Sequence, residues 1–418
     1  MGETERVGAP VARRDPTVTE LHGVTRVDDY AWMRNVEDPD VVEHLRGERA
    51  FYDATSMHLG PLVGTLANEM SGRVPSTERS AAWRLLRFFY YTKTPAGSDY
   101  GQLFRSFDQF EAHSATDFVA YSSQHAGSDT SGRLLLDPAT LAEGSSYVEL
   151  GLSLVSPNER LLAYSFDRCG DEVYTLRFRD LDTGEDLPDT LPRTYYGGAW
   201  SADSTTFFYT VHDEKYRPFQ VWRHRLGSPV ESDVKVLEEP DERFELSVRA
   251  CRSGDVALIW AESRDTTEVW LLDTHEPERQ AQVVEPRRSG VLYSCEHART
   301  HDGDRLFVVT NDGAPEFRLV SSPLHTPGRE HWQDVVVEDP QRRLHSVDAF
   351  DGYLVLTSRS VDSQLLTVLS LGDGSSYDVL PGPTAGTVRL DRNELYGVTE
   401  VTVAEESYTE PLTWHAVD

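Results

Sequence analysis

A short pattern of turns and strands recurs along most of this chain. Its clearest copy, "SPNERLLAYSFDRCGDEVYTLRFRDLDTG", runs from Ser156 to Gly184 and alternates polar turns with runs of β-branched and aromatic residues. Turn residues that flank such runs are typical of antiparallel hairpins. Related stretches follow at steps of 45 to 50 residues. They begin at Ser201, Cys251, Thr300 and Ala349, and a fainter copy at a shorter step begins at Leu390. A period of this length predicts the four-stranded blades of a β-propeller.

Two further blades complete the predicted ring. The runs "WRLLRFFYYTKT" and "YGQLFRSF", from Trp83 onward, predict a hairpin that forms the first blade, and residues 386–418 supply a short seventh. One blade cannot bury both faces of its sheet, whereas a closed ring of blades can. We therefore predict an all-β fold, a seven-bladed β-propeller over residues 78–418.

The segment before the propeller has helical periodicity instead. Asp38 is a predicted N-cap with Pro39 at the first helical position, and a second helix is predicted after Pro61. Both helices have an apolar face that needs a cover. We predict a short N-terminal α-helical arm over residues 1–77.

Composition excludes several classes of function. A net charge of −30 argues against nucleic acid and anionic membranes as partners, and it is compatible either with a basic ligand or with a solvated acidic surface. The three cysteines form no CxxC pair, which indicates reduced thiols. No apolar run is long enough to span a membrane, and residues 1–16 lack the apolar core of an export signal. We expect a cytoplasmic protein.

No metal or cofactor is expected from the motifs. "HEPER" at His275 lacks the second histidine of a zinc-protease helix, and a turn separates His297 from His301. "DLDTGED", from Asp180 to Asp186, lacks the distal glutamate of a calcium loop and is interpreted as an acidic turn.

Polar residues on the innermost strands are the candidate ligand-binding groups. Convergent charges in a partly dehydrated channel are candidates for binding, although they also serve simply to solvate the channel and pair with one another. A register error of one residue would reverse every face. The candidates are Ser153, Arg249, Glu296, His297, His345, Asp348 and Arg389.

Long colinear stretches resemble the oligopeptidase B branch of the prolyl oligopeptidase family. They are "RVDDYAWMRN", "NEMSGRV", "GDEVYTLRFRDLDTGE", "AWSADS", "FQVWRHRLG", "EEPDERF" and "LFVVTNDGAPEFRLV". The resemblance implies an N-terminal helical segment and a seven-bladed propeller, which in that family precede an α/β-hydrolase domain with a serine triad.

The sequence departs from the family pattern in one respect. The nucleophile elbow Gly-x-Ser-x-Gly is absent, and the sequence stops at "YTEPLTWHAVD". No family catalytic residue can be transferred to this sequence. We expect no serine peptidase activity from the chain alone.

The helical arm is the predicted interface. In the family this segment packs against the hydrolase domain, and without that domain its apolar side chains need another cover. The candidates are Tyr30, Trp32, Leu45 and Tyr52. A separate hydrolase subunit, a second copy of the chain or a refolded N-terminal segment would each cover them.

Three functions remain open from the sequence. The first is a stand-alone propeller that binds or gates a peptide or small molecule. The second is a repurposed enzyme, such as a cyclase, lyase or isomerase of a biosynthetic pathway, that uses the channel. The third is the propeller half of a split peptidase. The first is favoured, because function resides in a site and the family's catalytic site is missing.

Overall fold

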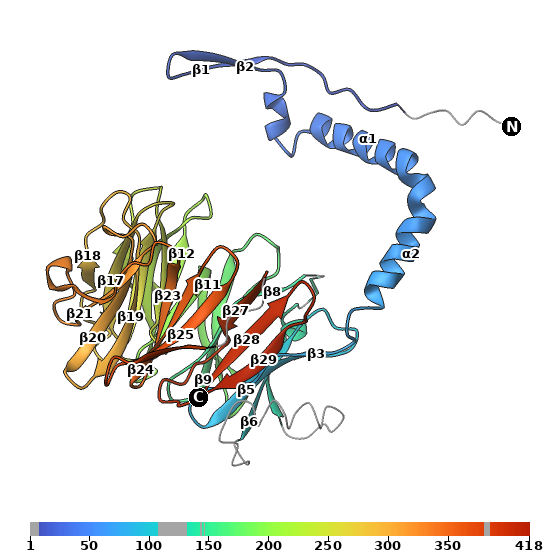
Figure 1. The fold of residues 1–418 in the computed structure, drawn as a ribbon. Coiled ribbons are helices and arrows are strands. Elements are labelled where there is room, and N and C mark those ends of the chain that lie inside the picture. The colour runs from blue at the N-terminus through green and yellow to red at the C-terminus, as the bar shows by residue number, and fades with distance from the viewer. Residues whose placement is uncertain (1–7, 108–131, 143, 146, 380–384) are drawn as a thin grey trace. The chain divides into compact units, whose positions relative to one another are not determined.

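The computed structural model of the protein describes residues 8–107, 132–142, 144–145, 147–379 and 385–418. By internal contacts the chain divides into two compact units, Met1–Ser76 and Thr77–Asp418. Figure 1 shows the first unit in blue and the second from cyan to red.

The first unit starts with a hairpin and continues as two helices. The hairpin turn holds His22 and Gly23 at φ 53° and 74°, as a two-residue turn of the I′ type requires. The predicted helix start is confirmed: Asp38 accepts a hydrogen bond from the Asp40 amide at 2.9 Å, and Pro39 is the first helical residue. The elements are β1 (Thr17–Leu21), β2 (Val24–Asp28), the 3₁₀ helices η1 (Ala31–Arg34) and η2 (Met57–Leu59), α1 (Pro39–Ser56) and α2 (Gly60–Ser71).

This unit has almost no core of its own. Along α1 and α2 only Val41 is buried. Trp32 is half-buried under Arg13, whose guanidinium lies 4.4 Å from the ring centre and whose carbonyl accepts from the indole N–H at 3.1 Å. Leu45 and Tyr52 are 59% and 60% exposed. The helices therefore present apolar side chains that their own unit does not cover.

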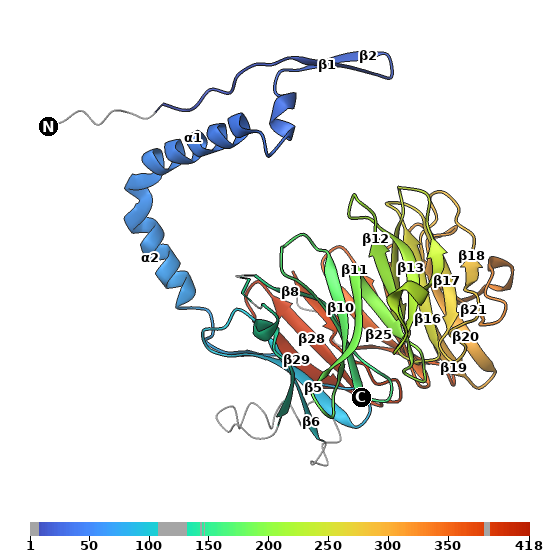
Figure 2. The same cartoon turned by 180° about the vertical axis from the view of Figure 1, so that it is seen from behind.

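The second unit is the seven-bladed β-propeller that the repeat predicted, with successive antiparallel sheets packed face to face (Figure 2). Blade one contains β3 (Glu78–Arg79), β4 (Trp83–Arg84), β5 (Phe88–Thr94), β6 (Gln102–Phe107) and β7 (Gly132–Leu136). Blades two and three contain β8 (Glu149–Val155), β9 (Leu161–Asp167), β10 (Tyr174–Asp180), β11 (Asp186–Trp200), β12 (Thr206–His212), β13 (Pro218–Arg225) and β14 (Val234–Glu238). Blade four contains β15 (Glu245–Ala250), β16 (Val256–Glu262), β17 (Thr267–Asp273) and β18 (Gln282–Glu285).

The remaining blades follow the same order. Blade five contains β19 (Tyr293–Thr300), β20 (Gly303–Thr310), β21 (Arg318–Pro323) and β22 (Gln333–Val336). Blade six contains β23 (Arg343–Phe350), β24 (Tyr353–Arg359), β25 (Gln364–Ser370) and β26 (Ser376–Val379), and blade seven contains β27 (Gly386–Leu390), β28 (Val401–Ser407) and β29 (Thr413–Val417). Short 3₁₀ helices connect strands at η3 (Pro138–Leu141), η4 (Val230–Ser232) and η5 (Arg329–His331).

One strand departs from the simple repeat. β11 pairs with β10 through its first part and with β12 through its last residues, so it is both the outer strand of blade two and the inner strand of blade three. Gly197 permits the close approach of its end to blade four, and Gly198 permits close packing against Phe207 of blade three. A Cβ at Gly197 would lie 2.9 Å from the Val248 carbonyl oxygen, and one at Gly198 would lie 2.4 Å from the Phe207 ring. Side chains are therefore excluded at both positions.

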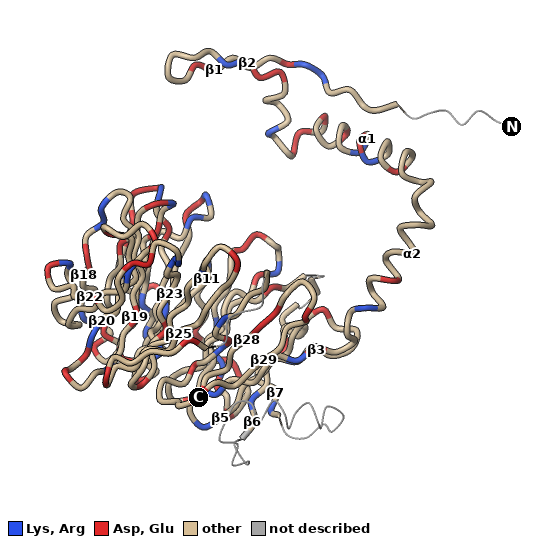
Figure 3. The backbone as a smooth tube through the Cα atoms, viewed as in Figure 1, with Lys and Arg blue, Asp and Glu red and all other residues tan. Residues whose placement is uncertain are grey.

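Apolar side chains fill the space between successive blades. Tyr90 and Leu162 belong to the cluster between blades one and two, and Leu258 and Leu306 to the one between blades four and five. Charged residues of both signs occupy the turns (Figure 3). Among the described residues, β27, β28 and β29 pair only with one another, so blade seven shares no strand with blade one.

Candidate functional site

Three of the predicted channel residues share one charged cluster. Arg249 lies on β15, Glu296 on β19 and Asp348 on β23, and each of these is the first strand of its blade. Burial raises the pKa of the Glu296 carboxyl, while Arg252 and Arg249 oppose that rise and Asp348 adds to it. Three inner strands and the turn after β15, which carries Arg252, thus bring four charged groups together.

Arg252 is the member of this cluster that the sequence interpretation missed. It donates to Asp348 Oδ1 at 2.9 Å, to the Ala349 carbonyl at 3.1 Å and to the Asn393 carbonyl at 2.5 Å. Its guanidinium also lies 4.3 Å from the centre of the Phe350 ring. A turn of blade four therefore reaches blades six and seven. The sequence did contain a signal for Arg252, because this residue lies two positions after a predicted inner strand.

A segment of blade seven crosses the same end of the channel. The Tyr396 hydroxyl accepts from the Arg299 amide at 2.9 Å, and its carbonyl accepts from the Asp351 amide at 3.0 Å. The Arg392 guanidinium lies 3.9 Å from the centre of the Trp83 ring in blade one. Residues 391–398 therefore join blades that lie on different sides of the ring.

The other four channel candidates make different contacts. His297 is fully buried, with Nδ1 2.7 Å from Ser253 Oγ, and burial lowers its pKa. Its neighbour Glu296 faces the charged cluster, as strand alternation requires. Ser153, His345 and Arg389 lie apart. Ser153 is half-buried on β8, His345 is exposed beside Arg343 and Arg359, and Arg389 pairs with Asp391 at 3.3 Å.

A cavity of about 400 Å³ lies at the opposite end of β15 from Arg252. Tyr195 and Tyr196 of β11 form one side, with their ring centroids 4.8 Å apart in an edge-to-face arrangement. The Tyr174 hydroxyl donates to that of Tyr196 at 2.5 Å and fixes this ring. The full lining is Tyr195, Tyr196, Pro218, Arg243, Glu245, Leu246, Ser247, Glu262, Ser263 and Arg264.

Two glutamates of the lining lie directly opposite each other. Glu245, the first residue of β15, is the cross-strand partner of Glu262, the last residue of β16. Partial burial in the cavity wall raises the pKa of Glu262, and Arg249 opposes the rise. Sequence reasoning did not single out this pair, although the two glutamates lie equally far from Ala250 and Ala257, the pair that closes the turn.

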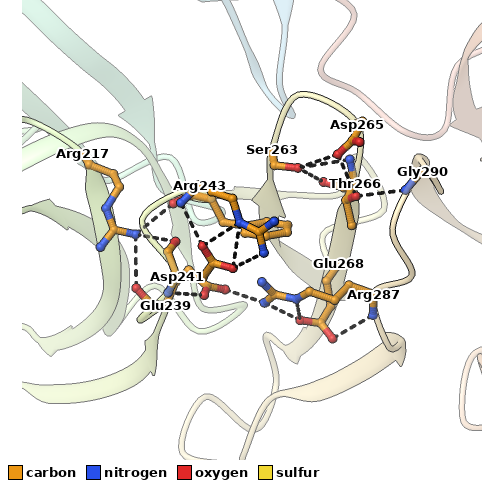
Figure 4. Close-up of polar contacts among 11 residues, drawn as sticks. Arg217, Glu239, Asp241, Arg243, Ser263, Asp265, Thr266, Glu268, Arg287 and Gly290 are labelled. Atoms are coloured by element: carbon orange, nitrogen blue, oxygen red, sulfur yellow. Dashed lines mark hydrogen bonds and ion pairs between the residues drawn. The ribbon is translucent and has the colours of Figure 1, made fainter. Parts of the chain in front are cut away.

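An ion-pair network holds the rim of this cavity (Figure 4). Arg217 donates to the carbonyls of Glu239, Asp241 and Phe244 at 3.0 to 3.2 Å. Arg243 binds both carboxylate oxygens of Asp241 and holds the pKa of that carboxyl at about 2.

Arg287 ties the same rim to blade four. Its guanidinium contacts the carboxylates of Glu239 and Glu268 and lies 4.0 Å from the centre of the Phe244 ring (Figure 4). The stretch "EEPDERF", one of those that resemble oligopeptidase B, thus holds the rim of the cavity in place.

The described part of the chain shows no side-chain cluster suited to a metal ion and no helix suited to crossing a membrane. No group of three or more His, Cys, Asp or Glu side chains there is arranged to hold a metal ion. Within the same ranges, no helix combines the length and apolar composition needed to cross a bilayer.

The comparisons with known proteins agree with this architecture. The chain matches the family described as prolyl oligopeptidase, N-terminal beta-propeller domain, over residues 10–418. It is 31% identical to Protease 2 of Moraxella lacunata over 97% of its length, and 32% identical to dipeptidyl aminopeptidase BI of Pseudoxanthomonas mexicana over 98%. In both cases it covers 56% of the relative, so the chain spans about half the length of the curated relatives that it matches.

A solved structure shows the same relation. Oligopeptidase B from Trypanosoma brucei, with covalently bound antipain and in a closed form, superposes with a TM-score of 0.87 at 26% identity. The match covers 98% of this chain and 59% of that one. The resemblance read from the sequence is confirmed.

Proposed function

Because the chain belongs to the prolyl oligopeptidase family, through its N-terminal β-propeller domain, we propose that it binds and gates peptide or small-molecule ligands. The cavity of about 400 Å³ next to the first strand of blade four carries this proposal. Residues 391–398 and Arg252 cross the channel at the other end of that strand. The cavity end is therefore the accessible mouth.

The size of the cavity limits what enters it. Small-molecule sites in proteins usually enclose about 300–1,000 Å³, and this cavity lies at the lower end of that range. It has room for one or two side chains of an extended peptide. Hydrogen bonds from Arg217 and Arg287 hold the rim residues in place, so the cavity keeps its shape without a ligand. This rigidity lowers the entropic cost of binding.

Binding of short peptides tests this proposal. Acetylated tetrapeptides with basic, neutral or acidic side chains are titrated into the protein and followed by NMR. At least one class is expected to bind, and Ser247→Trp, which fills the cavity, is expected to abolish binding. Val361→Trp adds the same ring at a fully exposed turn residue and should leave binding unchanged. The proposal fails if no class binds, or if Ser247→Trp binds as the parent protein does.

A second proposal concerns the helical arm, whose apolar side chains have no cover within their own unit. Leu62, Leu66 and Met70 on α2 are exposed, as Leu45 and Tyr52 are on α1. Soluble proteins rarely leave apolar patches of several hundred Å² open. The relatives extend well beyond the matched region, and the family resemblance implies an α/β-hydrolase there. The proposed occupant of this surface is such a hydrolase domain.

The arm proposal predicts a loss of association when charge is introduced. The chain is mixed with a separately produced hydrolase domain of this family, and the mass of the mixture is measured by light scattering. A one-to-one complex is expected, and Leu45→Glu combined with Tyr52→Glu should abolish it. The matched control is Val361→Glu, which introduces a charge at an exposed apolar residue of the propeller. A self-dimer that forms in place of the complex, or a complex that survives the double substitution, would contradict the proposal.

A further inference from the structure

Blade seven is not held in the ring by a shared strand, because its three strands pair only with one another in the described part of the chain. Its buried apolar cluster, which includes Val388 and Val401, joins it to Val355 of blade six. Residues 391–398, here called the strap, leave the end of β27 and reach blades four and five. The strap therefore supplies contacts that the sheet of blade seven does not make.

The side chain of Asn393 folds the start of the strap. Its Nδ2 donates to the carbonyls of Asp391 and Thr402 at 2.8 and 2.9 Å, and its Oδ1 accepts from the Thr402 amide at 2.8 Å. Both donors and the oxygen of the side-chain amide thus fix the strap against β28. The backbone carbonyl of Asn393 takes no part in these bonds and accepts from Arg252 instead.

Arg252 of blade four is the first anchor of the strap. Its side chain is 15% exposed, and its three nitrogens donate to three different acceptors. These are the Asn393 carbonyl of the strap and, in blade six, the Ala349 carbonyl and the Asp348 carboxylate. A guanidinium presents its donors in a fixed plane, so one orientation satisfies all three contacts. The anchor therefore holds the strap at a defined position across the channel.

Tyr396 is the second anchor, and it is 7% exposed. Its hydroxyl accepts from the amide of Arg299 in blade five at 2.9 Å. The Arg299 guanidinium in turn donates to Asp255 at 2.7 Å and to the Ser253 carbonyl at 3.0 Å. Both of these acceptors lie in the turn of blade four that carries the first anchor. Both anchors therefore depend on one turn of blade four.

We infer that the strap is an internal clasp, which fastens blade seven to blades four and five across the end of the channel. The inference goes beyond the proposed function, because it needs no ligand. In a ring of seven blades, blade four lies on the other side of the channel from blade seven, so contacts between them cross the channel. The same contacts hold blade seven in the ring and close this end of the channel. Release of the strap would open that end and loosen β27 and β28 together.

Hydrogen exchange of backbone amides tests the clasp. Arg252→Ala and Tyr396→Ala are each expected to speed exchange in the strap, β27 and β28 about tenfold, because blade seven then opens without breaking that anchor. Exchange in β9 of blade two should stay within about twofold of the parent protein. The matched controls are Arg225→Ala, at a side chain that is 74% exposed, and Tyr408→Ala, at a residue of blade seven that is 97% exposed. Both controls should change exchange less than about twofold.

Proteolysis gives an independent measure of strap release. Chymotrypsin cleaves after tyrosine, and Tyr396 is buried while the strap is in place. Cleavage at Tyr396, identified by mass spectrometry, is expected to be about tenfold faster in Arg252→Ala than in the parent protein. Arg225→Ala should be cleaved there at the rate of the parent protein. A substitution in blade four would thus expose a residue of blade seven.

Two further variants test whether the strap acts as one unit. If both anchors hold the same strap, loss of one leaves little for the other to contribute. The combined Arg252→Ala and Tyr396→Ala variant should therefore exchange less than about threefold faster in β27 and β28 than the faster single variant. Tyr396→Phe removes only the hydroxyl, so its effect should have the same location and a smaller size. This milder variant also serves as the test if Tyr396→Ala does not fold.

Three results would overturn the inference. Unchanged exchange of β27 and β28 in both Arg252→Ala and Tyr396→Ala would show that blade seven is held without the strap. Fully multiplicative effects of the two substitutions would show that the anchors act separately. Equal acceleration in β9 would show a general loss of stability in place of strap release. None of these results bears on peptide binding, so the proposed function is tested separately.

Discussion

Replacement of His224 by phenylalanine is expected to lower the free energy of unfolding by about 3–5 kcal/mol, because it removes the side chain that bonds two buried carboxylates. The His224 ring is 1% exposed and lies between two buried carboxylates, with Nδ1 2.7 Å from Asp233 and Nε2 2.9 Å from Asp189. Phenylalanine keeps the stacking on Phe178 and leaves both carboxylates without their bond to the imidazole ring. Urea denaturation at neutral pH measures the loss.

Two control variants identify the unpaired buried carboxylates as the cause. Combining His224→Phe with Asp189→Asn and Asp233→Asn should restore part of the stability, because no uncompensated charge remains. The Gly227 amide and the Tyr209 hydroxyl still donate to those side chains. His275→Phe, which removes an exposed pairing with Asp255, should cost less than about 1 kcal/mol. A similar loss in His224→Phe and His275→Phe would show that the buried cluster does not stabilise the propeller.

Replacement of Glu159 by alanine is expected to cost about 2–3 kcal/mol through lost charge-assisted hydrogen bonds. The Glu159 side chain is 0% exposed and comes from the first turn of blade two. It accepts from the amides of Leu86, Arg87 and Phe88 at 3.0 to 3.3 Å and from the Tyr90 hydroxyl at 3.4 Å, all in blade one. Removal of the carboxylate leaves several donors of the neighbouring blade without their acceptor.

Thermal and urea unfolding of three variants tests this clamp. Glu159→Gln keeps an acceptor oxygen and should fall between the parent protein and Glu159→Ala. Glu185→Ala, at an exposed glutamate in another turn of the same blade, should stay within about 0.5 kcal/mol of the parent protein. If Glu159→Ala is no less stable than Glu185→Ala, the contact does not hold blades one and two together.

Most of the fold could be predicted from local patterns. Alternating strands and polar turns repeat at blade length, and they located β9, β12, β16, β20 and β24. The start of α1 followed from Asp38 and Pro39, since capping depends on neighbouring residues only. The shared strand β11 was not predicted. Its pairing with both β10 and β12 depends on long-range register, and Gly197 allows its close approach to blade four.

The candidate site was predicted only in part. Arg249, Glu296 and Asp348 were selected as polar residues on first strands, and the structure brings them into one cluster. His297 was selected by the same rule and is buried against Ser253 instead, because adjacent residues of a strand face opposite sides.

Local sequence determined the blades, the arm helices and the family, because turn chemistry and side-chain periodicity act over a few residues. The tertiary structure alone decided which side chains meet. Arg252 reaches the Asn393 carbonyl across 141 residues of sequence, because the segment between β27 and β28 crosses the channel toward blade four. The pairing of Glu245 with Glu262 against Tyr195 depends on strand register and on the packing of blade three against blade four. Distances of this kind arise from closure of the ring, which no short stretch of sequence encodes.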